Sequence, residues 1–381
     1  MKKVLILTSS LIKGTGGVAS IVELGENLIK LKNNVNYSTT SYKEDNHKSK
    51  KIIDLSYIRF FELYNSGSKI KYGLSKVYSF FKLVFAFLDG NIKLIKNFDY
   101  ILVASNYNVK VIRFLKKNTK AKLIFNHPAD YELMKLWLSD TNLMDNSFYK
   151  EYLFLFDHVL FQSEFQMKDC YNITNLDNLT FINPICDHNS IDEVLNSDNQ
   201  EIKKKFNNNS LNVLVTGTVF ERKNQLVIAE QMSKLSKKST LHLVGKIDNQ
   251  DYMYKIDNIS KSNPQFNVLF HGFKNDFLFF LKYSDVFINF SSNEGVSRSL
   301  REAMYCDKLI IASDIPGSKE YLKDGSGTLI DYNSPNLIYD ELKKINKNEN
   351  CNISYPRKSR EVYLKYFDQI IYKEKLNKLF K

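Results

Sequence analysis

The sequence predicts an α/β protein built from two doubly wound domains, each with a parallel sheet, that face each other across a cleft. Short, continuous apolar runs alternate with segments of helical periodicity, which is the pattern of buried parallel strands joined by helices. The alternation stops at a polar, basic stretch, residues 201–210, and then begins again. The length of 381 residues agrees, because one hydrophobic core rarely extends beyond roughly 250–300 residues.

The first half opens with the apolar run VLILT at residues 4–8, which suits a first buried strand. Residues 18–32 follow, with apolar side chains on one helical stripe. Residues 50–97 are rich in Phe, Tyr and Lys and are expected to be helical. The later strands are expected at 35–40, 100–105, 122–127 and 158–163.

The second half repeats the alternation of strands and helices. One helix is expected from about residue 223, and another contains Glu302. The strands are expected at 212–218, 240–246, 267–273, 286–290, 308–314 and 327–331. The amphipathic pattern of 360–380 predicts a final helix that packs back on the first domain. The predicted parts are a first domain over 1–190, a second domain over 191–355 and a C-terminal helix over 356–381.

The net charge of +12 lies in the N-terminal third. Residues 1–122 contain 22 Lys and Arg against 8 Asp and Glu, a net charge of +14. Such a field favours anionic partners, namely membrane lipid, phosphate groups or nucleic acid, and a solvated basic surface is the plain alternative. The region contains no RNP-like, helix-turn-helix or zinc pattern, so nucleic acid is not expected.

The four cysteines form no CxxC pair and no cluster with zinc spacing, which suits a reducing cytosol. The longest membrane-like run, residues 77–88, contains Lys82 and is too short to span a bilayer. A cytoplasmic location is therefore expected. The same run, with its neighbouring lysines, also suits peripheral contact with the inner face of the cell membrane.

Residues 291–304, SSNEGVSRSLREAM, place two carboxylates around a predicted helix start. Glu294 lies four residues past a strand, where the ligands of open α/β sheets bind. The first amides of the helix, near Ser297, Arg298 and Ser299, suit a phosphate. Glu302 then lies within reach of hydroxyl groups beside that phosphate. The plain alternative is a surface pair between Arg298 and Glu302, worth ~0.3–0.5 kcal/mol.

A second segment, GTVFERKNQ at residues 217–225, also follows a predicted strand. Its adjacent cations, Arg222 and Lys223, suit a diphosphate, although each alone is more often an exposed side chain. Gly272 and Phe273 end a third strand, where backbone groups could meet a base. Together these segments describe a site for a sugar nucleotide.

At this point the sequence resembles a known family. The segment NEGVSRSLREAMYCDKLIIASDIPGSKEYLKDGSGTLID resembles the retaining glycosyltransferases of family 4, which have the GT-B fold. It contains in order E-x7-E, EAM, a small-residue turn, an apolar strand, G-x-x-E and G-x-G. The blocks GTVFERKNQ, LHLVG and LFHGF also match. The N-terminal match is looser and rests on GGVASIVELGENLIKLKNNV, HPADY, DHVLFQS and INPICD.

The resemblance implies roles for the matching residues. Glu294 would contact the donor sugar, with backbone amides of Val296 and Ser297 beside it. Glu302 would bind the ribose hydroxyls, and Lys223 would neutralise the diphosphate. Further donor-site positions are Gly217, Arg298, Ser299, Gly272 and Phe273.

In the N-terminal domain the resemblance implies that His127 sits opposite the donor sugar, although a surface or capped histidine is the alternative. Gly16 and Gly17 would let the first loop approach the phosphate. One departure stands out: where the family usually has Arg, this chain has Thr218. Arg222, beside Lys223, would then replace that charge.

The implied reaction is transfer of a hexosyl or N-acetylhexosaminyl group from a nucleotide-sugar, with UDP as the implied nucleotide. The implied acceptor is a saccharide or a lipid-linked saccharide in bacterial capsule or lipopolysaccharide assembly. No Asp-x-Asp occurs in the chain, so a metal-independent reaction without a cofactor is expected.

Two alternatives remain open. The chain could be a non-catalytic protein that binds sugar nucleotides or glycans with the same fold, which Thr218 permits. GTGGVA at residues 14–19 also fits the G-x-G-x-x-A fingerprint of dinucleotide sites. However, five residues separate it from the strand, and no acidic residue follows where the ribose would bind.

Overall fold

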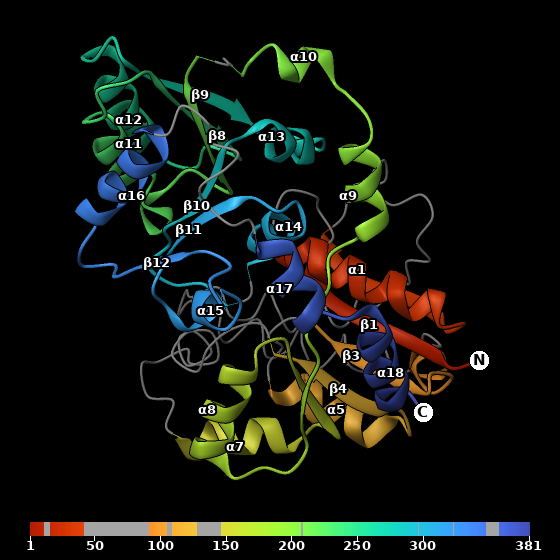
Figure 1. The fold of residues 1–381 in the computed structure, drawn as a ribbon. Coiled ribbons are helices and arrows are strands. Elements are labelled where there is room, and N and C mark those ends of the chain that lie inside the picture. Colours follow the sequence, from red (N-terminus) through yellow and green to blue (C-terminus); the bar gives the residue numbers. More distant parts are fainter. Residues whose placement is uncertain are drawn as a thin grey trace. The chain divides into compact units, whose positions relative to one another are not determined.

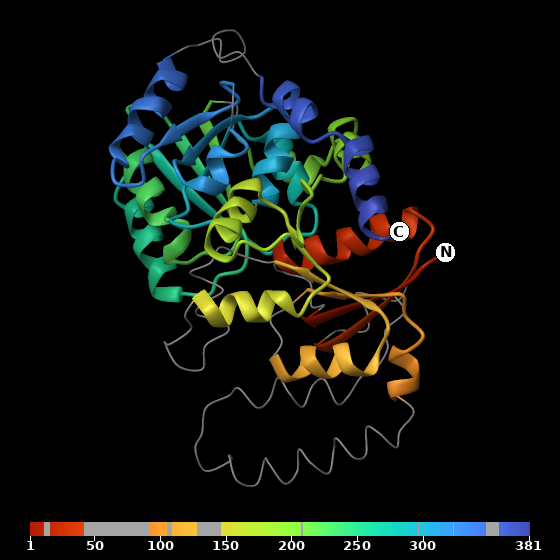
Figure 2. The same ribbon diagram turned by 90° about the horizontal axis from the view of Figure 1, so that it is seen from below.

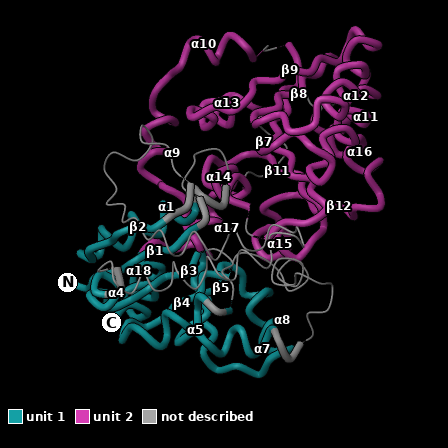
Figure 3. Tube along the Cα trace, turned by 180° about the vertical axis from the view of Figure 1, so that it is seen from behind, with its two compact units in different colours: residues 1–183, 370–381 teal, residues 184–369 magenta. Residues whose placement is uncertain are grey.

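The computed structural model describes residues 1–10, 16–41, 91–104, 109–127, 146–206, 209–295, 297–322, 324–347 and 358–381. Two compact units emerge, one of residues 1–183 with 370–381 and the other of residues 184–369 (Figure 3). Each unit has a six-stranded sheet in which every paired strand is parallel. The α/β class predicted from the apolar runs is confirmed.

The first unit has the strand order β2-β1-β3-β4-β5-β6. Figure 1 shows β1, β3 and β4 next to one another in that order. The central strand β3 is a continuous apolar run, and all four of its residues are buried. The strands are β1 (Lys3–Ser10), β2 (Asn34–Ser41), β3 (Tyr100–Val103), β4 (Lys122–Asn126), β5 (His158–Phe161) and β6 (Leu179–Phe181). Strand β6 was not among the predicted strands.

Helices connect these strands, and Figure 2 shows α1, in red, and α5, in orange, on opposite faces of the sheet. That arrangement is the doubly wound pattern that the sequence predicts. The helices are α1 (Gly16–Lys30), α4 (Asn91–Ile95), α5 (Val109–Asn118), α7 (Asn146–Phe154), α8 (Glu164–Thr174) and α18 (Gln369–Leu379). The expected membrane-contacting run at 77–88 lies outside the described residues.

The second unit has the strand order β12-β11-β10-β7-β8-β9. Read from β9, this is the order 3-2-1-4-5-6 of dinucleotide-binding folds. The strands are β7 (Leu211–Thr216), β8 (Ser239–Val244), β9 (Phe266–Gly272), β10 (Val286–Asn289), β11 (Leu309–Ser313) and β12 (Thr328–Ile330). From β7 the chain adds β8 and β9 on one side, and it then returns to add β10, β11 and β12 on the other side. A ligand is expected at this switch point, beyond the carboxyl ends of β7 and β10.

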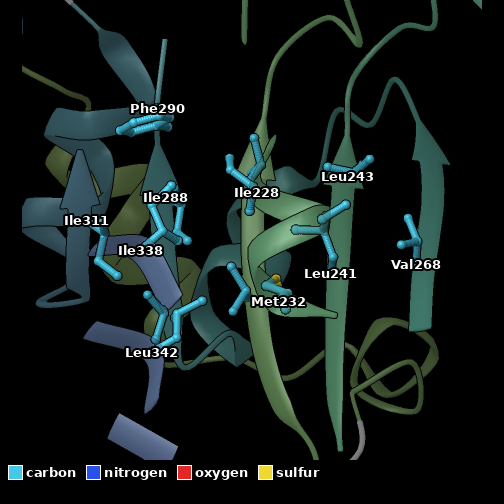
Figure 4. Packing of buried hydrophobic residues seen from close by; sticks show 14 of the residues in the cluster. Ile228, Met232, Leu241, Leu243, Val268, Ile288, Phe290, Ile311, Ile338 and Leu342 are labelled. Carbon is cyan, nitrogen blue, oxygen red and sulfur yellow. The ribbon is translucent and has the colours of Figure 1, made fainter. Parts of the chain in front are cut away.

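The helices of the second unit surround this sheet. They are α9 (His188–Leu195), α10 (Gln200–Lys203), α11 (Gln225–Met232), α12 (Gln250–Lys261), α13 (Phe277–Tyr283), α14 (Arg298–Tyr305), α15 (Pro316–Lys319), α16 (Asn336–Lys347) and α17 (Ser359–Tyr366). The core forms where α11 and α16 pack on the strands, and Figure 4 shows Ile228 and Met232 of α11 beside Leu241 of β8. This packing holds the strand ends that carry the site.

The C-terminal region differs from the single helix predicted over 356–381. It contains two helices, α17 in the second unit and α18, nearly all of which belongs to the first. Phe367 leaves helical conformation at φ −120°, ψ 50°. Its buried ring stacks on Tyr321 and Tyr363, each 4.9 Å away. Burial of that ring outweighs helical continuity. In the first unit, the Phe380 ring lies 5.1 Å from Tyr100 of β3.

The division between units also differs from the predicted boundary at residue 190. The chain passes to the second unit after Asn183. Position 190 lies within α9, and the polar stretch 201–210 begins with α10 rather than serving only as a linker. Ile191 and Ile202 are buried, and each short helix begins with a side-chain cap, Asp187 for α9 and Asn199 for α10. Each of these two short helices thus has one buried apolar side chain and one capping side chain that hold it in place.

Candidate functional site

Two loops of the second unit meet at the carboxyl ends of β7 and β10. The amide of Ser292 donates to the carbonyl of Arg222 at 3.0 Å. The Asn224 amide group donates to the carbonyl of Phe290 at 3.2 Å, and Arg222 Nη1 donates to the carbonyl of Asn293 at 2.6 Å. The predicted segments 217–225 and 291–304, about seventy residues apart in the chain, therefore form one site.

Glu294 is the centre of that site. Lys223 Nζ forms an ion pair with Glu294 Oε1, Ser291 Oγ donates to the same oxygen at 3.0 Å, and Arg222 Nη1 lies 3.6 Å from it. The side chains of Glu294 and Lys223 are only 14% and 12% exposed, whereas that of Arg222 is 44% exposed. The nearly buried carboxylate of Glu294 thus has two cations beside its Oε1 atom, at the carboxyl edge of the sheet.

The helix α14 supplies the second carboxylate. Ser297 caps its first turn by accepting from the amide of Leu300, and Ser299 Oγ lies 3.3 Å from Ser297 Oγ. The helix therefore begins where its sequence predicts, with amides of its first turn available to an anion. Val296 lies outside the described residues.

Glu302 is almost fully buried and accepts a hydrogen bond from Arg298 Nε at 2.9 Å. Burial raises the pKa of Glu302, and the charges of Arg298 and Arg301 oppose that rise. The Arg298–Glu302 pair is consequently not the exposed surface pair considered above, because one partner lies in the interior. Arg301 is also fully buried, and its guanidinium has no hydrogen-bond partner among the described residues.

Close backbone packing shapes both loops. Gly217 has φ +112°, a left-handed conformation that favours glycine, and its amide donates to the carbonyl of Val244 at 2.9 Å. A Cβ on Gly317, at the start of α15, would overlap the carbonyl oxygens of Glu294 and Gly295. The glycine of the G-x-x-E motif thus lets α15 lie directly against the loop that carries Glu294.

The other predicted positions of the second unit lie along the same edge of the sheet. The carbonyl of Thr218 accepts from Gln225 Nε2 at 2.9 Å. The carbonyl of Gly272 accepts from the amide of Gly245 at 2.9 Å. Phe273 is 48% exposed. The strand order puts β9 two strands from β7, so Phe273 lies farther along this edge than Arg222 and Lys223 do, and its role at the donor stays a prediction.

The predicted residues of the first unit are placed differently. His127, at the end of β4, is 2% exposed, and its Nε2 lies 2.7 Å from the hydroxyl of Tyr149. Its ring also stacks on Phe161 at 4.5 Å. His127 is thus placed as a core histidine, and its contact with a sugar stays a prediction. Gly16 and Gly17 form the first turn of α1 rather than the loop before it.

Two contributors to the site were missed by sequence reasoning, Ser291 and Gly245. Ser291 is fully buried two residues beyond β10 and looks like one more polar loop residue in sequence. A Cβ on Gly245 would overlap the carbonyl of Gly217. The position of Gly245 directly after β8 was the available signal, because the ends of neighbouring parallel strands lie together.

Neither a metal centre nor a membrane span is found in the part of the chain that the structure describes. In those residues, no group of three or more His, Cys, Asp and Glu side chains is placed to hold a metal ion. Over the same ranges, no helix combines the length and apolar character needed to cross a bilayer.

Comparison with known proteins agrees with this geometry. Residues 196–363 match the family model described as glycosyl transferases group 1. An uncharacterized glycosyltransferase of Methanocaldococcus jannaschii is 29% identical over 196 residues, which are 46% of this chain and 49% of the relative. The match thus spans about half of that relative's length.

Solved structures resemble the whole chain. The crystal structure of Anabaena HepE in complex with UDP and glucose has a TM-score of 0.74 and 15% identity, covering 100% of this chain and 99% of that one. WaaG, a glycosyltransferase involved in lipopolysaccharide biosynthesis, has a TM-score of 0.70 and 14% identity, covering 99% and 98%. At such identities the likeness shows the fold, which is the GT-B fold of two Rossmann-like units.

Proposed function

We propose that this chain is a retaining glycosyltransferase of family 4 that transfers a hexosyl or N-acetylhexosaminyl group from a UDP-sugar. The observation that carries the proposal is the meeting of Lys223, Arg222 and Glu294 at the carboxyl ends of β7 and β10. The family match of residues 196–363 supports the same reaction class. The UDP and glucose named with HepE support the choice of donor.

In the proposed reaction, the bond between the anomeric carbon and the diphosphate breaks. Negative charge then grows on the leaving diphosphate, and preorganised donors lower the barrier most when they point to that charge. Lys223, Arg222 and the first amides of α14 are the donors in this site. Arg222 has the greater freedom to reorient because its side chain is more exposed than that of Lys223. In this role it would replace the arginine that the family usually has at the position of Thr218.

The two carboxylates would hold the two ends of the donor. Glu294 would accept a hydrogen bond from a sugar hydroxyl, since it lies beside the cations. Glu302 would accept from the ribose hydroxyls, and Arg298 holds its Oε1 by a hydrogen bond inside the unit. For retention, the acceptor hydroxyl attacks on the face that the diphosphate leaves, and its proton passes to the departing diphosphate. No step in this scheme needs a metal ion.

The acceptor is proposed to be a saccharide or a lipid-linked saccharide of a bacterial surface glycan such as capsule or lipopolysaccharide. The involvement of WaaG in lipopolysaccharide biosynthesis supports this class, as does the basic charge of residues 1–122. The same class of acceptor agrees with a cytoplasmic location, which we also propose. The first unit would bind the acceptor. Its basic surface would hold the enzyme at the inner face of the membrane.

The first experiment is a thermal-shift screen of the purified chain with UDP, UDP-glucose, UDP-galactose, UDP-N-acetylglucosamine and GDP-mannose. A bound donor raises the melting temperature by mass action, so one UDP-sugar should stabilise the chain more than UDP does. Product NMR should then show the anomeric configuration of the donor. A chain that binds none of these nucleotides would contradict the proposal, and an inverted product would contradict retention.

The second candidate is a non-catalytic protein that binds sugar nucleotides, which Thr218 favours by weakening the cationic site. Release of UDP from the stabilising donor separates the two candidates. Slow hydrolysis or transfer that falls sharply in Glu294→Gln would support the enzyme. Binding without any turnover of donor, with or without saccharide acceptors, would support the binding protein.

A further inference from the structure

The carboxylate of Glu294 has a third neighbour besides its two cations. Ser291 Oγ lies 3.0 Å from Glu294 Oε1, and Ser291 is fully buried. Within the described part of the chain, every polar contact of the carboxylate is made through Oε1. Oε2 is therefore the oxygen left for a ligand. The direction in which Oε2 points depends on the contacts that hold Oε1, because both belong to one rigid carboxylate.

Ser291 is itself held from two sides. Its carbonyl accepts a hydrogen bond from the buried hydroxyl of Ser313 in β11 at 2.7 Å. Its Oγ lies 3.1 Å from the amide group of Asn289, the last residue of β10. The serine is therefore anchored to two strands of the sheet. Arg222 and Lys223, in contrast, reach Glu294 from a loop that begins at another strand.

The hydrogen-bond inventory indicates which way the serine points. A serine hydroxyl has one proton, and both Glu294 and Asn289 Oδ1 lie within its reach. Asn289 Nδ2 is buried with no partner among the described residues. The carboxylate of Glu294 is the stronger acceptor of the serine proton, because it is charged and the amide oxygen of Asn289 is neutral.

A diphosphate would change the contacts of Glu294. It offers Lys223 and Arg222 more negative charge than one carboxylate does, so both cations would turn toward it. Glu294 would then lose its cationic partners as the sugar arrives. We propose that Ser291 is the positioning residue that keeps Glu294 aimed at the donor sugar once the diphosphate has drawn Lys223 away. This inference rests on the proposed function.

The test compares Ser291→Ala with Ser284→Ala. Ser284 is a matched control, because its buried hydroxyl donates to the carbonyl of Leu281 at 3.0 Å just before β10 begins. We expect Ser291→Ala to lower kcat/KM for the active UDP-sugar about ten- to a hundred-fold, since a hydrogen bond to a charged group is lost. Binding of UDP alone should stay within about twofold, because UDP lacks the sugar. Ser284→Ala should leave both values unchanged.

A double-mutant cycle separates positioning from a general effect on the fold. In a Glu294→Gln background, Ser291→Ala should cause little further loss, because the effect acts through the carboxylate. If Ser291→Ala does not fold, Ser291→Cys keeps a weak donor and is expected to retain intermediate activity.

Three results would contradict the inference. They are kcat/KM within twofold of the wild type for Ser291→Ala, loss of UDP binding together with activity, and full additivity with Glu294→Gln. Failure of the proposed function looks different: the unmodified chain would bind neither UDP nor GDP-mannose in the thermal-shift screen.

Discussion

At the scale of single residues, the contribution of the Glu294–Lys223 ion pair to stability depends on its burial. Both side chains are nearly buried, and a buried ion pair is weak support for stability because both charges lose their hydration. Removing one partner, however, leaves a buried charge and costs about 3–5 kcal/mol. The pair is better explained by ligand binding, since a diphosphate and a sugar hydroxyl would each take one partner.

This pair predicts the effect of substitutions that keep its shape. Glu294→Gln and Lys223→Met should each reduce transfer by at least about a hundredfold, because the sugar contact or the charge on the leaving group is lost. Lys246→Ala is the control, since Lys246 is 71% exposed and pairs with exposed Asp248. Steady-state kinetics with circular dichroism measures both activity and folding. Near-normal turnover by folded Glu294→Gln would show that this site is not the reaction centre.

Glu302 has a different predicted effect because we propose that it binds the ribose of the donor. Glu302→Gln keeps the size of the side chain but loses the charge that Arg298 partners. Donor KM should rise at least about tenfold while kcat changes less, since the ribose contact is equal in the ground and transition states. Initial rates over a range of donor concentrations measure this. A fall in kcat alone would place Glu302 at the reacting centre instead.

At the scale of elements, α15 determines where the Glu294 loop can lie. Gly317 lets the helix contact the backbone of Glu294 and Gly295 directly. The loop and the helix are therefore fitted to each other without an intervening side chain. The short helix has a structural role in the site although it supplies none of the charged groups described above.

Gly317→Ala should displace the loop and weaken donor binding, because the new Cβ overlaps two carbonyl oxygens. Ser318→Ala is the neighbouring control. The Ser318 hydroxyl is buried and has no hydrogen-bond partner in the described chain, so its loss should be nearly neutral. Calorimetric titration with the stabilising UDP-sugar gives the affinities. Equal affinity for Gly317→Ala and the wild type would show that the loop adapts.

Strands β8 and β9 carry a histidine pair, with His242 buried and His271 partly buried, that makes stability depend on pH. His242 Nδ1 lies 3.1 Å from His271 Nε2, and the His242 ring stacks on Phe206 at 4.1 Å. Burial, with the charge of His271, lowers the pKa of His242 to about 3. Burial, with nearby Lys205 and Lys274, lowers the pKa of His271 to about 4. Both rings are therefore neutral in the folded chain near pH 6.

In the unfolded chain the two histidines titrate near their ordinary pKa of about 6.5. Between that pH and about 4, the unfolded state binds more protons than the folded state, so the free energy of unfolding falls as the pH falls. Urea unfolding from pH 7.5 to 4.5 should show this slope. His271→Gln, which removes one titrating ring, should make the slope shallower. An unchanged slope would mean that other titrating groups cause the pH dependence of stability.

At the scale of the whole molecule, charge is distributed unevenly along the chain. Residues 1–122 carry a net charge of +14, while the remainder carries a net charge of −2. The excess is therefore a property of one region rather than of the average composition. It concentrates attraction for anionic surfaces in the part of the chain that belongs to the first unit.

The full chain should consequently bind vesicles that contain phosphatidylglycerol more tightly than vesicles of phosphatidylcholine alone. Each cation near an anionic surface contributes about 1 kcal/mol, and salt screens this attraction. Flotation at low and high salt measures the binding. Retention at high salt would indicate apolar insertion, and no binding at low salt would remove the membrane from the proposal.

Much of this organisation can be predicted from the sequence because it is locally encoded. Apolar runs such as 286–290 predict buried strands, and Ser297 predicts the start of α14. The rule that ligands bind at the carboxyl ends of parallel strands then places Glu294 and Lys223 at one edge. These inferences need only short-range periodicity and the polarity of strand ends. They do not depend on which strands are neighbours in the sheet.

The tertiary structure alone decided the strand order and the contacts that depend on it. Pairing of β10 with β7 joins the two loops, and contact with α15 explains Gly317. Burial of Ser291 and of His127 follows from packing by segments distant in sequence. A sequence specifies residue types and local periodicity directly, whereas burial and partnership arise from long-range packing, which only the folded chain reveals.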